Sequence, residues 1–329
     1  MNFKSKIKEQ FEHFKIKLPE CSKYKKQYYA DYIELISLIS DDFVSRADIR
    51  DRLQDEGKRV EIDKPTDGEI GSVESQINDR EEGYVNTYFD YIEKRSSIYK
   101  THYPFHIDKE KGIKRIEKDF LTEHQKLYIY LLIASSLNTF VKLKTYITDD
   151  FEKISELALK AYLPPSAKVY GFGSNSIYEG NAKDKIRKLA KDINIYRLDD
   201  RVIDQIPDQN SKEKGLDIIG WVPFEDENPN TLIVLGQSAC GKNWFGKQIE
   251  TSRYNRFYQH YLIPFIYAMF YPEDFDNRDG VFQLDTDLIG NLVFERRRLI
   301  NLINQNIFKD LRYGDQIVNQ YMEYQEDLV

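Results

Sequence analysis

The sequence predicts an α/β fold for its C-terminal half, in which helices flank a mixed sheet, and an all-α region before it. The apolar runs Leu216–Val222 and 231–236 are joined by polar turn residues, as in two adjacent buried strands. Helical patterns lie on both sides of this pair, while residues 1–140 are mainly of helical periodicity. We therefore expect two domains, 1–147 and 148–329.

The first domain is expected to consist of helices. Ser45 and Asp48 have the spacing of a capping box, which would begin a short polar helix. Residues 57–72 contain Pro and Gly and are predicted to form a loop or small hairpin. Helices are expected over residues 28–39, 46–54, 73–100 and 122–140.

The second domain begins with an amphipathic helix, 151–163, whose start is expected near Thr148 and whose end is set by Pro164. A short strand, 168–172, should follow it. The remaining elements are expected in the order basic helix 183–193, polar surface segment 198–215, strands 216–222 and 231–236, helix 256–270, strand 281–286 and helix 290–306. This order places helices on both faces of a mixed sheet.

Composition limits the classes of function. The net charge of −7 means that any nucleic-acid surface has to be a local patch. Cys21 and Cys240 are far apart in the sequence, which indicates a reducing compartment and excludes a disulfide framework. The first 17 residues carry charges throughout, unlike a signal peptide, and the longest apolar run, 127–137, is too short to span a bilayer. We expect a cytoplasmic protein without a membrane partner.

Two polar residues stand out in the predicted strand pair. Asp217 lies near the start of the first strand, and Gln237 ends the second. A buried carboxylate or amide is costly without a partner, and a metal ion is a frequent partner of such an acid. Taken alone, each residue has a structural alternative, namely a strand acid bonded to a neighbouring turn or a satisfied strand-end amide.

A third residue gives these two a context. Glu152 follows Phe151 on the helix before the sheet, Asp217 lies in the segment Gly-Leu-Asp-Ile-Ile, and Gln237 closes the next strand. In this order the chain resembles the restriction-endonuclease-like, or PD-(D/E)xK, nuclease superfamily over roughly residues 148–306. The similarity is greatest to the Mrr-like form, in which Gln occupies the second acidic position.

The resemblance implies a metal-dependent nuclease that hydrolyses DNA phosphodiester bonds. Asp217 and Glu152 would bind Mg²⁺ or Mn²⁺, with Gln237 beside them, because hard cations take oxygen ligands. The family places a lysine two residues after the Gln, where this chain has Ala239. We expect Lys242 to be the catalytic lysine, with Lys247 as the other candidate, since a lysine can orient water and offset developing charge.

Basic residues provide candidate DNA contacts. The helix 183–193 supplies Lys183, Arg187 and Lys188, and the last helix supplies Arg296 and Arg297. The alternative for both groups is a solvated helix face.

Other hydrolase classes fit less well. The segment Gly236-x4-Gly241-Lys242 has Asn243 where a phosphate loop has Ser or Thr, and no acidic strand follows at the usual distance. The five His residues lack zinc-site spacing, and Ser238 lacks a nucleophile elbow. Cys240 has no His nearby in the sequence and is expected to be a small core residue.

The biological role follows only from the resemblance. Nucleases of this kind with an added helical domain often serve prokaryotic defence against phage or foreign DNA. The helical domain would then contact a helicase, an ATPase or a second copy of the chain. The main alternative is a catalytically inactive subunit that keeps the fold and binds nucleic acid or a partner protein, and a remoter one is an interaction protein without any nucleic-acid role.

Overall fold

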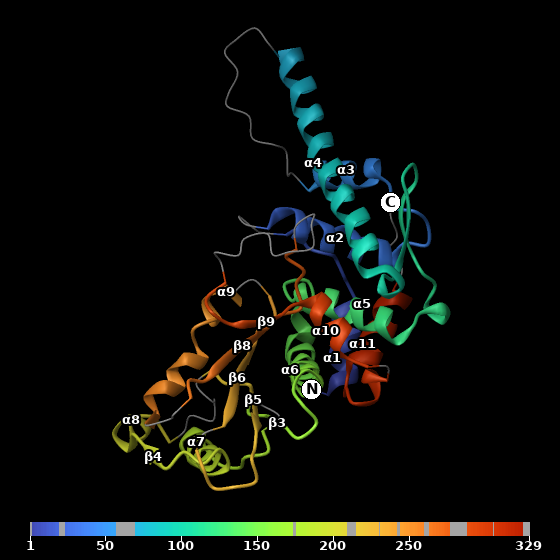
Figure 1. Ribbon diagram of the computed structural model, residues 1–329. Coiled ribbons are helices and arrows are strands. Elements are labelled where there is room, and N and C mark those ends of the chain that lie inside the picture. Colours follow the sequence, from blue (N-terminus) through green and yellow to red (C-terminus); the bar gives the residue numbers. More distant parts are fainter. Residues whose placement is uncertain are drawn as a thin grey trace. The chain divides into compact units, whose positions relative to one another are not determined.

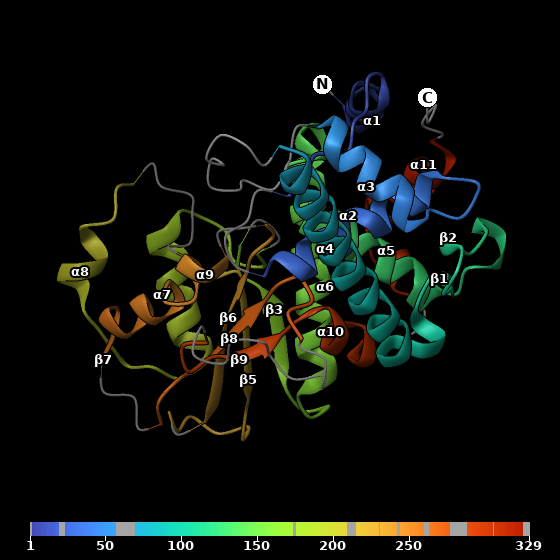
Figure 2. The ribbon, with the colours of Figure 1, turned by 90° about the horizontal axis from the view of Figure 1, so that it is seen from above.

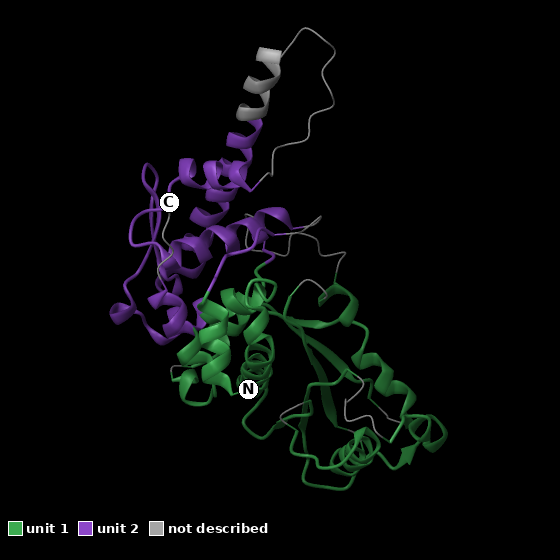
Figure 3. Cartoon of the chain, turned by 180° about the vertical axis from the view of Figure 1, so that it is seen from behind, with its two compact units in different colours: residues 1–12, 130–274, 284–317 green, residues 13–129, 275–283, 318–329 purple. Residues whose placement is uncertain are grey.

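The structure is a computed structural model that describes residues 2–19, 24–56, 70–173, 176–208, 215–229, 231–241, 244–259, 263–276, 288–304 and 306–324 (Figure 1). Contacts divide the chain into two compact units (Figure 3). Unit 1 comprises residues 1–12, 130–274 and 284–317, and unit 2 comprises 13–129, 275–283 and 318–329. The division expected near residue 147 falls inside helix α6 (Lys144–Tyr162).

Unit 2 contains helices α2 (Lys25–Ile39), α3 (Arg46–Asp55) and α4 (Ile70–Tyr99), as predicted. The capping box is confirmed, since the Ser45 hydroxyl accepts the N–H of Asp48 and the Asp48 carboxylate accepts that of Ser45. A hairpin of β1 (Phe105–Asp108) and β2 (Gly112–Arg115) was not predicted, because each strand is only four residues long. Helix α5 (Glu123–Ser135) begins in unit 2 and ends in unit 1.

A buried ion network lies in the core of unit 2. The Arg95 guanidinium is 2.7 Å from Asp31 and 3.1 Å from Glu34, and the three side chains are almost completely buried. The hydroxyls of Tyr103 and Tyr128 donate to Glu34. Removing one member of such a network leaves an uncompensated buried charge, so the network fixes how α2 and α4 pack.

Unit 1 contains a five-stranded mixed sheet, which confirms the α/β prediction. Its order is β3 (Lys168–Gly171), β5 (Ile218–Val222), β6 (Leu232–Ser238), β8 (Ile266–Phe270) and β9 (Leu292–Phe294). Strand β5 pairs antiparallel with both β3 and β6, whereas β8 pairs parallel with both β6 and β9.

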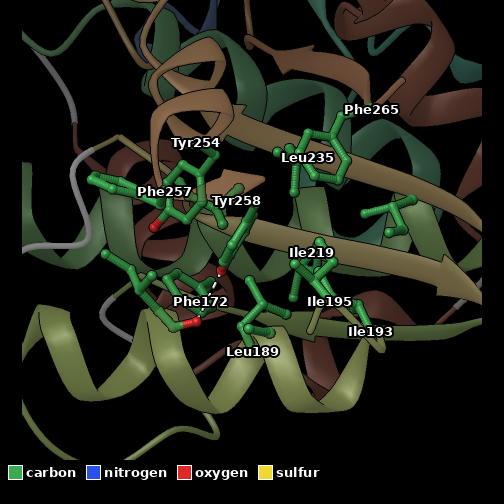
Figure 4. Close-up of a cluster of buried hydrophobic side chains, with 14 of the residues drawn as sticks. Phe172, Leu189, Ile193, Ile195, Ile219, Leu235, Tyr254, Phe257, Tyr258 and Phe265 are labelled. Carbon is green, nitrogen blue, oxygen red and sulfur yellow. Dashed lines mark hydrogen bonds between the residues drawn. The ribbon is translucent and has the colours of Figure 1, made fainter. Parts of the chain in front are cut away.

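Helices cover both faces of this sheet (Figure 2). On one face α6 packs close to β5, because Gly220 has no side chain and leaves room for Leu159 and Leu163. On the other face lie α7 (Ala182–Asp192) and the 3-10 helix η4 (Thr251–Arg256). Their apolar side chains, among them Leu189 and Tyr254, form one core with Ile219 of β5 and Leu235 of β6 (Figure 4).

Two predicted helices were wrong in type or extent. Residues 266–270 of the expected helix 256–270 form β8, because an apolar run this short, placed after Pro264, pairs with β6 as a buried parallel strand. Within the expected helix 290–306, residues 292–294 form β9 and helix α10 (Arg296–Leu302) starts only after Glu295, which accepts the N–H groups of Arg297 and Arg298. The predicted strand 281–286 lies outside the described residues.

The remaining elements are short. The segment expected to be a polar excursion contains β4 (Arg197–Leu198), which pairs with β7 (Tyr258–Gln259), and helix α8 (Asp200–Asp204). The others are α1 (Phe3–Phe11), α9 (Trp244–Lys247), α11 (Gly314–Glu323), η1 (Lys100–His102), η2 (Lys118–Phe120), η3 (Val141–Leu143) and η6 (Ile307–Lys309). Among the described residues, no helix is both long and apolar enough to cross a membrane.

Candidate functional site

Asp217 and Gln237 lie at the same edge of the unit 1 sheet. Asp217 directly precedes β5, and its N–H donates to the carbonyl of Gly236 on β6 at 2.9 Å. The antiparallel register pairs Ile218 with Gly236, so Gln237 follows within one residue of this point. The C-terminal end of β3 reaches the same edge, since Gly171 pairs with Ile218. Ligands of open α/β sheets commonly bind at the carboxyl ends of strands.

Among the contacts of the Asp217 carboxylate are N–H groups of Gln237 and Ser238. Gln237 Nε2 donates to Asp217 Oδ2 at 2.7 Å, and the backbone N–H of Ser238 donates to the same oxygen at 2.8 Å. These bonds orient the carboxylate so that its other oxygen, Oδ1, faces Gly173.

Glu152 reaches this edge from α6. Leu159 of the same helix packs at Gly220. Glu152 lies seven residues before Leu159, which corresponds to about 10 Å along the helix axis. From Gly220 to Asp217 the extended chain also covers about 10 Å. The helix and the strand therefore bring Glu152 and Asp217 to the same level of the sheet.

The two carboxylates converge at Gly173. A methyl group placed on Gly173 would lie 3.0 Å from Glu152 Oε2 and 3.3 Å from Asp217 Oδ1. The distance between Glu152 Oε2 and Asp217 Oδ1 is therefore at most about twice the distance from either oxygen to this methyl position. Glycine at position 173 leaves a small space between them that any side chain would fill.

The amide of Gln237 contributes an oxygen without a partner. The Gln237 side chain is 4% exposed, and among the described residues its Oε1 atom accepts no hydrogen bond. The bond from Nε2 to Asp217 fixes the amide orientation, because the flipped amide would turn its oxygen toward the carboxylate. Ser238 Oγ is likewise buried and has no partner among the described side chains and backbone.

This donor set fits a hard divalent cation. No group of three or more His, Cys, Asp and Glu in the described part of the chain forms a metal site by itself. Mg²⁺, however, commonly takes only one or two carboxylates and completes its octahedron with water and substrate phosphate. Glu152 Oε2, Asp217 Oδ1 and the unpartnered Gln237 oxygen provide such a set.

Of the two candidate catalytic lysines, the structure describes only one, Lys247. Lys242, the predicted catalytic lysine, lies outside the described residues. Lys247 ends α9 and acts electrostatically on the Cys240 thiol. Burial raises the pKa of this thiol, the charges of Glu273, Glu152 and Asp217 raise it further, and the charge of Lys247 acts in the opposite direction. Because the thiolate is the nucleophilic form, this environment argues against a nucleophilic Cys240.

Two charged residues near the site were not predicted. Lys185 of α7 is 8% exposed, and its ammonium donates to the Gly173 carbonyl at 3.4 Å. Its spacing from Ala182 and Leu189 places it on the apolar face of α7, which was a usable sequence signal. Glu250 approaches Gln237 from the segment after α9, and nothing in the local sequence indicated this.

The basic residues of α7 are engaged within the chain. Lys183 pairs with Asp208 at 2.7 Å, and Lys188 donates to the Glu179 carbonyl at 2.7 Å. Arg187 is 3.0 Å from Asp200 and 2.8 Å from Asp204, and the hydrogen bonds to these acids raise its pKa. The assignment of these residues to DNA contact stays a prediction.

The prediction of a phosphate contact for Arg296 is wrong. Its guanidinium is completely buried and donates to the Pro272 carbonyl at 2.9 Å and to Ser135 Oγ at 3.1 Å. It links α10 to α5 and the end of β8, since a buried guanidinium needs such acceptors. Arg297 is half-buried, so Arg296 and Arg297 do not form a continuous exposed basic surface.

The site thus consists of residues from α6, the start of β5 and the end of β6, arranged around Gly173. No protein-family model, no curated protein and no solved structure matches this chain. The function has to be inferred from the geometry of the site itself.

Proposed function

We propose that the protein is a metal-dependent nuclease that hydrolyses DNA phosphodiester bonds with Mg²⁺ or Mn²⁺. The observation that carries this proposal is the convergence of Glu152 Oε2 and Asp217 Oδ1 at Gly173, beside the unpartnered amide oxygen of Gln237. Two carboxylates this close repel one another unless a cation or a shared proton compensates their charge.

The order of elements also supports the proposal. Helix α6, the antiparallel strands β3, β5 and β6, and the parallel strand β8 follow the order that the resemblance to the PD-(D/E)xK superfamily implies. The residues that match the family pattern, Glu152, Asp217 and Gln237, come from the elements expected to carry them. We therefore assign the unit 1 sheet to the restriction-endonuclease-like fold as part of this proposal.

Each residue has a distinct part in the proposed reaction. A bound divalent cation would polarise the phosphate and lower the pKa of a water molecule. Asp217 offers one fixed oxygen, because Gln237 and Ser238 immobilise the other, and Glu152 offers the second. Lys247 or Lys242 would offset the negative charge that builds up on the phosphate. The proposed biological setting is defence against phage or foreign DNA, with a helicase, an ATPase or a second copy as partner.

One observation favours a second candidate function. Ala239 occupies the position of the family lysine, and Lys183 and Arg187 are paired with acids of the chain itself. These features suit a catalytically inactive subunit that keeps the site and binds nucleic acid or a partner protein.

Cleavage of labelled duplex and single-stranded DNA by the purified full-length protein tests the proposal. With Mg²⁺ or Mn²⁺, Asp217→Asn should lower the cleavage rate by about 100-fold, because it removes a charged ligand that acts on the transition state. Glu156→Gln is the matched control, since Glu156 lies one turn after Glu152 on α6 but pairs with Lys153 at 2.8 Å. Its rate should stay within about twofold of wild type.

The alternative makes a different prediction for the same experiment. If the wild-type protein binds DNA in a salt-dependent manner but leaves every substrate intact with either metal, the nuclease proposal fails and the binding subunit is favoured.

A further inference from the structure

A second acidic side chain lies against the unpartnered oxygen of Gln237. A methyl group on Gly215 would lie 3.0 Å from Glu250 Oε2 and 3.1 Å from Gln237 Oε1. These two oxygens are therefore at most about twice this distance apart, on the side of Gln237 opposite to its bond with Asp217. Gly215 has a φ of 89°, a left-handed conformation suited to glycine, which brings the backbone this close.

Two hydrogen-bond acceptors that face each other are stable when a cation or a hydrogen-bond donor lies between them. Gln237 Oε1 cannot turn into a donor, because its own Nε2 is committed to Asp217 at 2.7 Å. Glu250 carries a carboxylate, which accepts hydrogen bonds and donates none when ionised. A buried carbonyl oxygen without a hydrogen bond destabilises the native state, so the protein gains stability if a cation occupies this position.

We propose that Gln237 Oε1 and Glu250 form a second cation-binding oxygen pair of the site, next to the pair formed by Asp217 and Glu152. The proposal deepens the metal site of the proposed function and rests on it. Gln237 joins the two pairs, since its nitrogen holds Asp217 and its oxygen faces Glu250. The ligand is a divalent cation of oxygen preference, Mg²⁺ or Mn²⁺.

The charge at this edge supports a cation rather than an anion. Glu152, Asp217 and Glu250 supply three carboxylates around one buried amide. Two of the acids, Glu152 and Asp217, form one pair, and the third, Glu250, pairs with the Gln237 amide oxygen. This arrangement agrees with the lack of any three-residue metal group among the described side chains.

Mn²⁺ binding to the full-length protein tests the inference without reference to catalysis. Electron paramagnetic resonance follows the free Mn²⁺ concentration and so gives the affinity and the number of ions bound per chain. Glu250→Gln should weaken the affinity by about 10-fold or reduce the number of bound ions by one per chain. Glu227→Gln is the matched control, because Glu227 is an exposed acid in the turn at the opposite end of β5 and β6, and its affinity should equal that of wild type.

Thermal unfolding gives a second readout. In EDTA, Glu250→Gln should unfold at the same or a higher temperature than wild type, because it removes one of three nearby negative charges. Adding Mn²⁺ should raise the unfolding temperature less for this variant than for wild type, because an ion that binds the native state more weakly stabilises it less. Glu250→Asp keeps the charge and shortens the side chain, so its stabilisation by Mn²⁺ should be intermediate between those of wild type and Glu250→Gln.

The outcomes separate the two proposals. If Asp217→Asn abolishes Mn²⁺ binding while Glu250→Gln and Glu250→Asp keep wild-type affinity and stoichiometry, the second oxygen pair is refuted and the first survives. If wild-type protein binds neither Mn²⁺ nor Mg²⁺, both proposals fail together.

Discussion

At the scale of single residues, the absence of a side chain at Gly173 is what lets the candidate site exist. Glu152 Oε2 and Asp217 Oδ1 both lie within 3.3 Å of the place where a Cβ would be. The backbone φ of Gly173 is not in the left-handed region, so glycine is needed here for the space it leaves and not for its conformational freedom. A change at this position can therefore separate metal binding from folding.

Gly173→Ala tests this point. The added methyl should fill the space between the two carboxylates and reduce Mn²⁺ affinity by about 10-fold or more, while thermal unfolding in EDTA shifts little. Gly83→Ala is a suitable control, because an added Cβ at Gly83 would meet no heavy atom within 4 Å. Unchanged Mn²⁺ affinity in Gly173→Ala would place the metal elsewhere.

Sequence reasoning reached the site residues but not their full surroundings. Asp217 and Gln237 could be predicted because a polar residue in an apolar strand is a local signal. Lys185 was detectable from its place on the apolar face of α7, but it was not among the predicted site residues. Glu250 was not detectable, since its approach to Gly215 depends on how the chain folds back after α9.

At the scale of elements, Asp150 of α6 organises the start of α11. Its buried carboxylate accepts the backbone N–H groups of Arg312, Tyr313 and Gly314 at 2.7–3.0 Å. Gly314 is the first residue of α11 and the other two directly precede it, so Asp150 satisfies N–H groups at a helix start, where the helix itself offers no acceptor. Asp150 thereby ties the helix that carries Glu152 to a segment more than 160 residues away in the sequence.

Asp150→Ala should lower the free energy of unfolding by about 3 kcal/mol, because it leaves three backbone donors without an acceptor. Urea denaturation measures this difference. Asp149→Ala, which changes the neighbouring acid, should have a smaller effect, and equal effects of the two changes would contradict the capping role.

The pH dependence of the same residue has a defined sign. Burial raises the pKa of Asp150 above 3.8, although the three backbone hydrogen bonds act in the opposite direction. The native state therefore holds this proton more tightly than the unfolded state, and its contribution to stability falls as the pH rises from 3.8 through the native pKa. Asp150→Asn should lack this component when unfolding is compared across that range.

The elements that were mispredicted share one cause. Residues 266–270 and 292–294 are short apolar runs, and local periodicity does not distinguish a buried parallel strand from a piece of helix. Pairing with β6 and β8 decides their conformation, and this pairing is a contact between residues far apart in the sequence.

At the scale of the whole molecule, each compact unit is assembled from several separated segments. Within unit 1, the ring of Phe3 in α1 packs against that of Tyr313 with 4.6 Å between centroids, and Tyr146 packs edge-on against the same ring at 4.8 Å. Arg296 donates to Ser135 Oγ. The N-terminal segments 1–12 and 130–147 thus belong to the unit that contains the sheet.

A fragment comprising residues 148–329 should therefore not fold as the sheet domain alone. It lacks Phe3, Ser135 and Tyr146, leaves the buried Arg296 without one of its acceptors, and starts within α6. We expect no cooperative thermal transition and no near-ultraviolet circular dichroism, in contrast to the full-length chain. A sharp transition in the fragment would show that these contacts are dispensable.

Glu152 became a candidate only through the resemblance to a nuclease superfamily. The sequence by itself determined the fold class, the strands β3, β5 and β6, the capping box of α3, and Asp217 and Gln237 as candidate site residues. Each of these rests on local signals, namely alternation, capping chemistry and polar residues within apolar strands. Only the tertiary structure decided that Arg296 is buried, that 266–270 is a strand, and that Glu250 faces Gln237. The physical reason is that burial, parallel pairing and convergence of charges arise from contacts between distant segments, which local patterns do not encode.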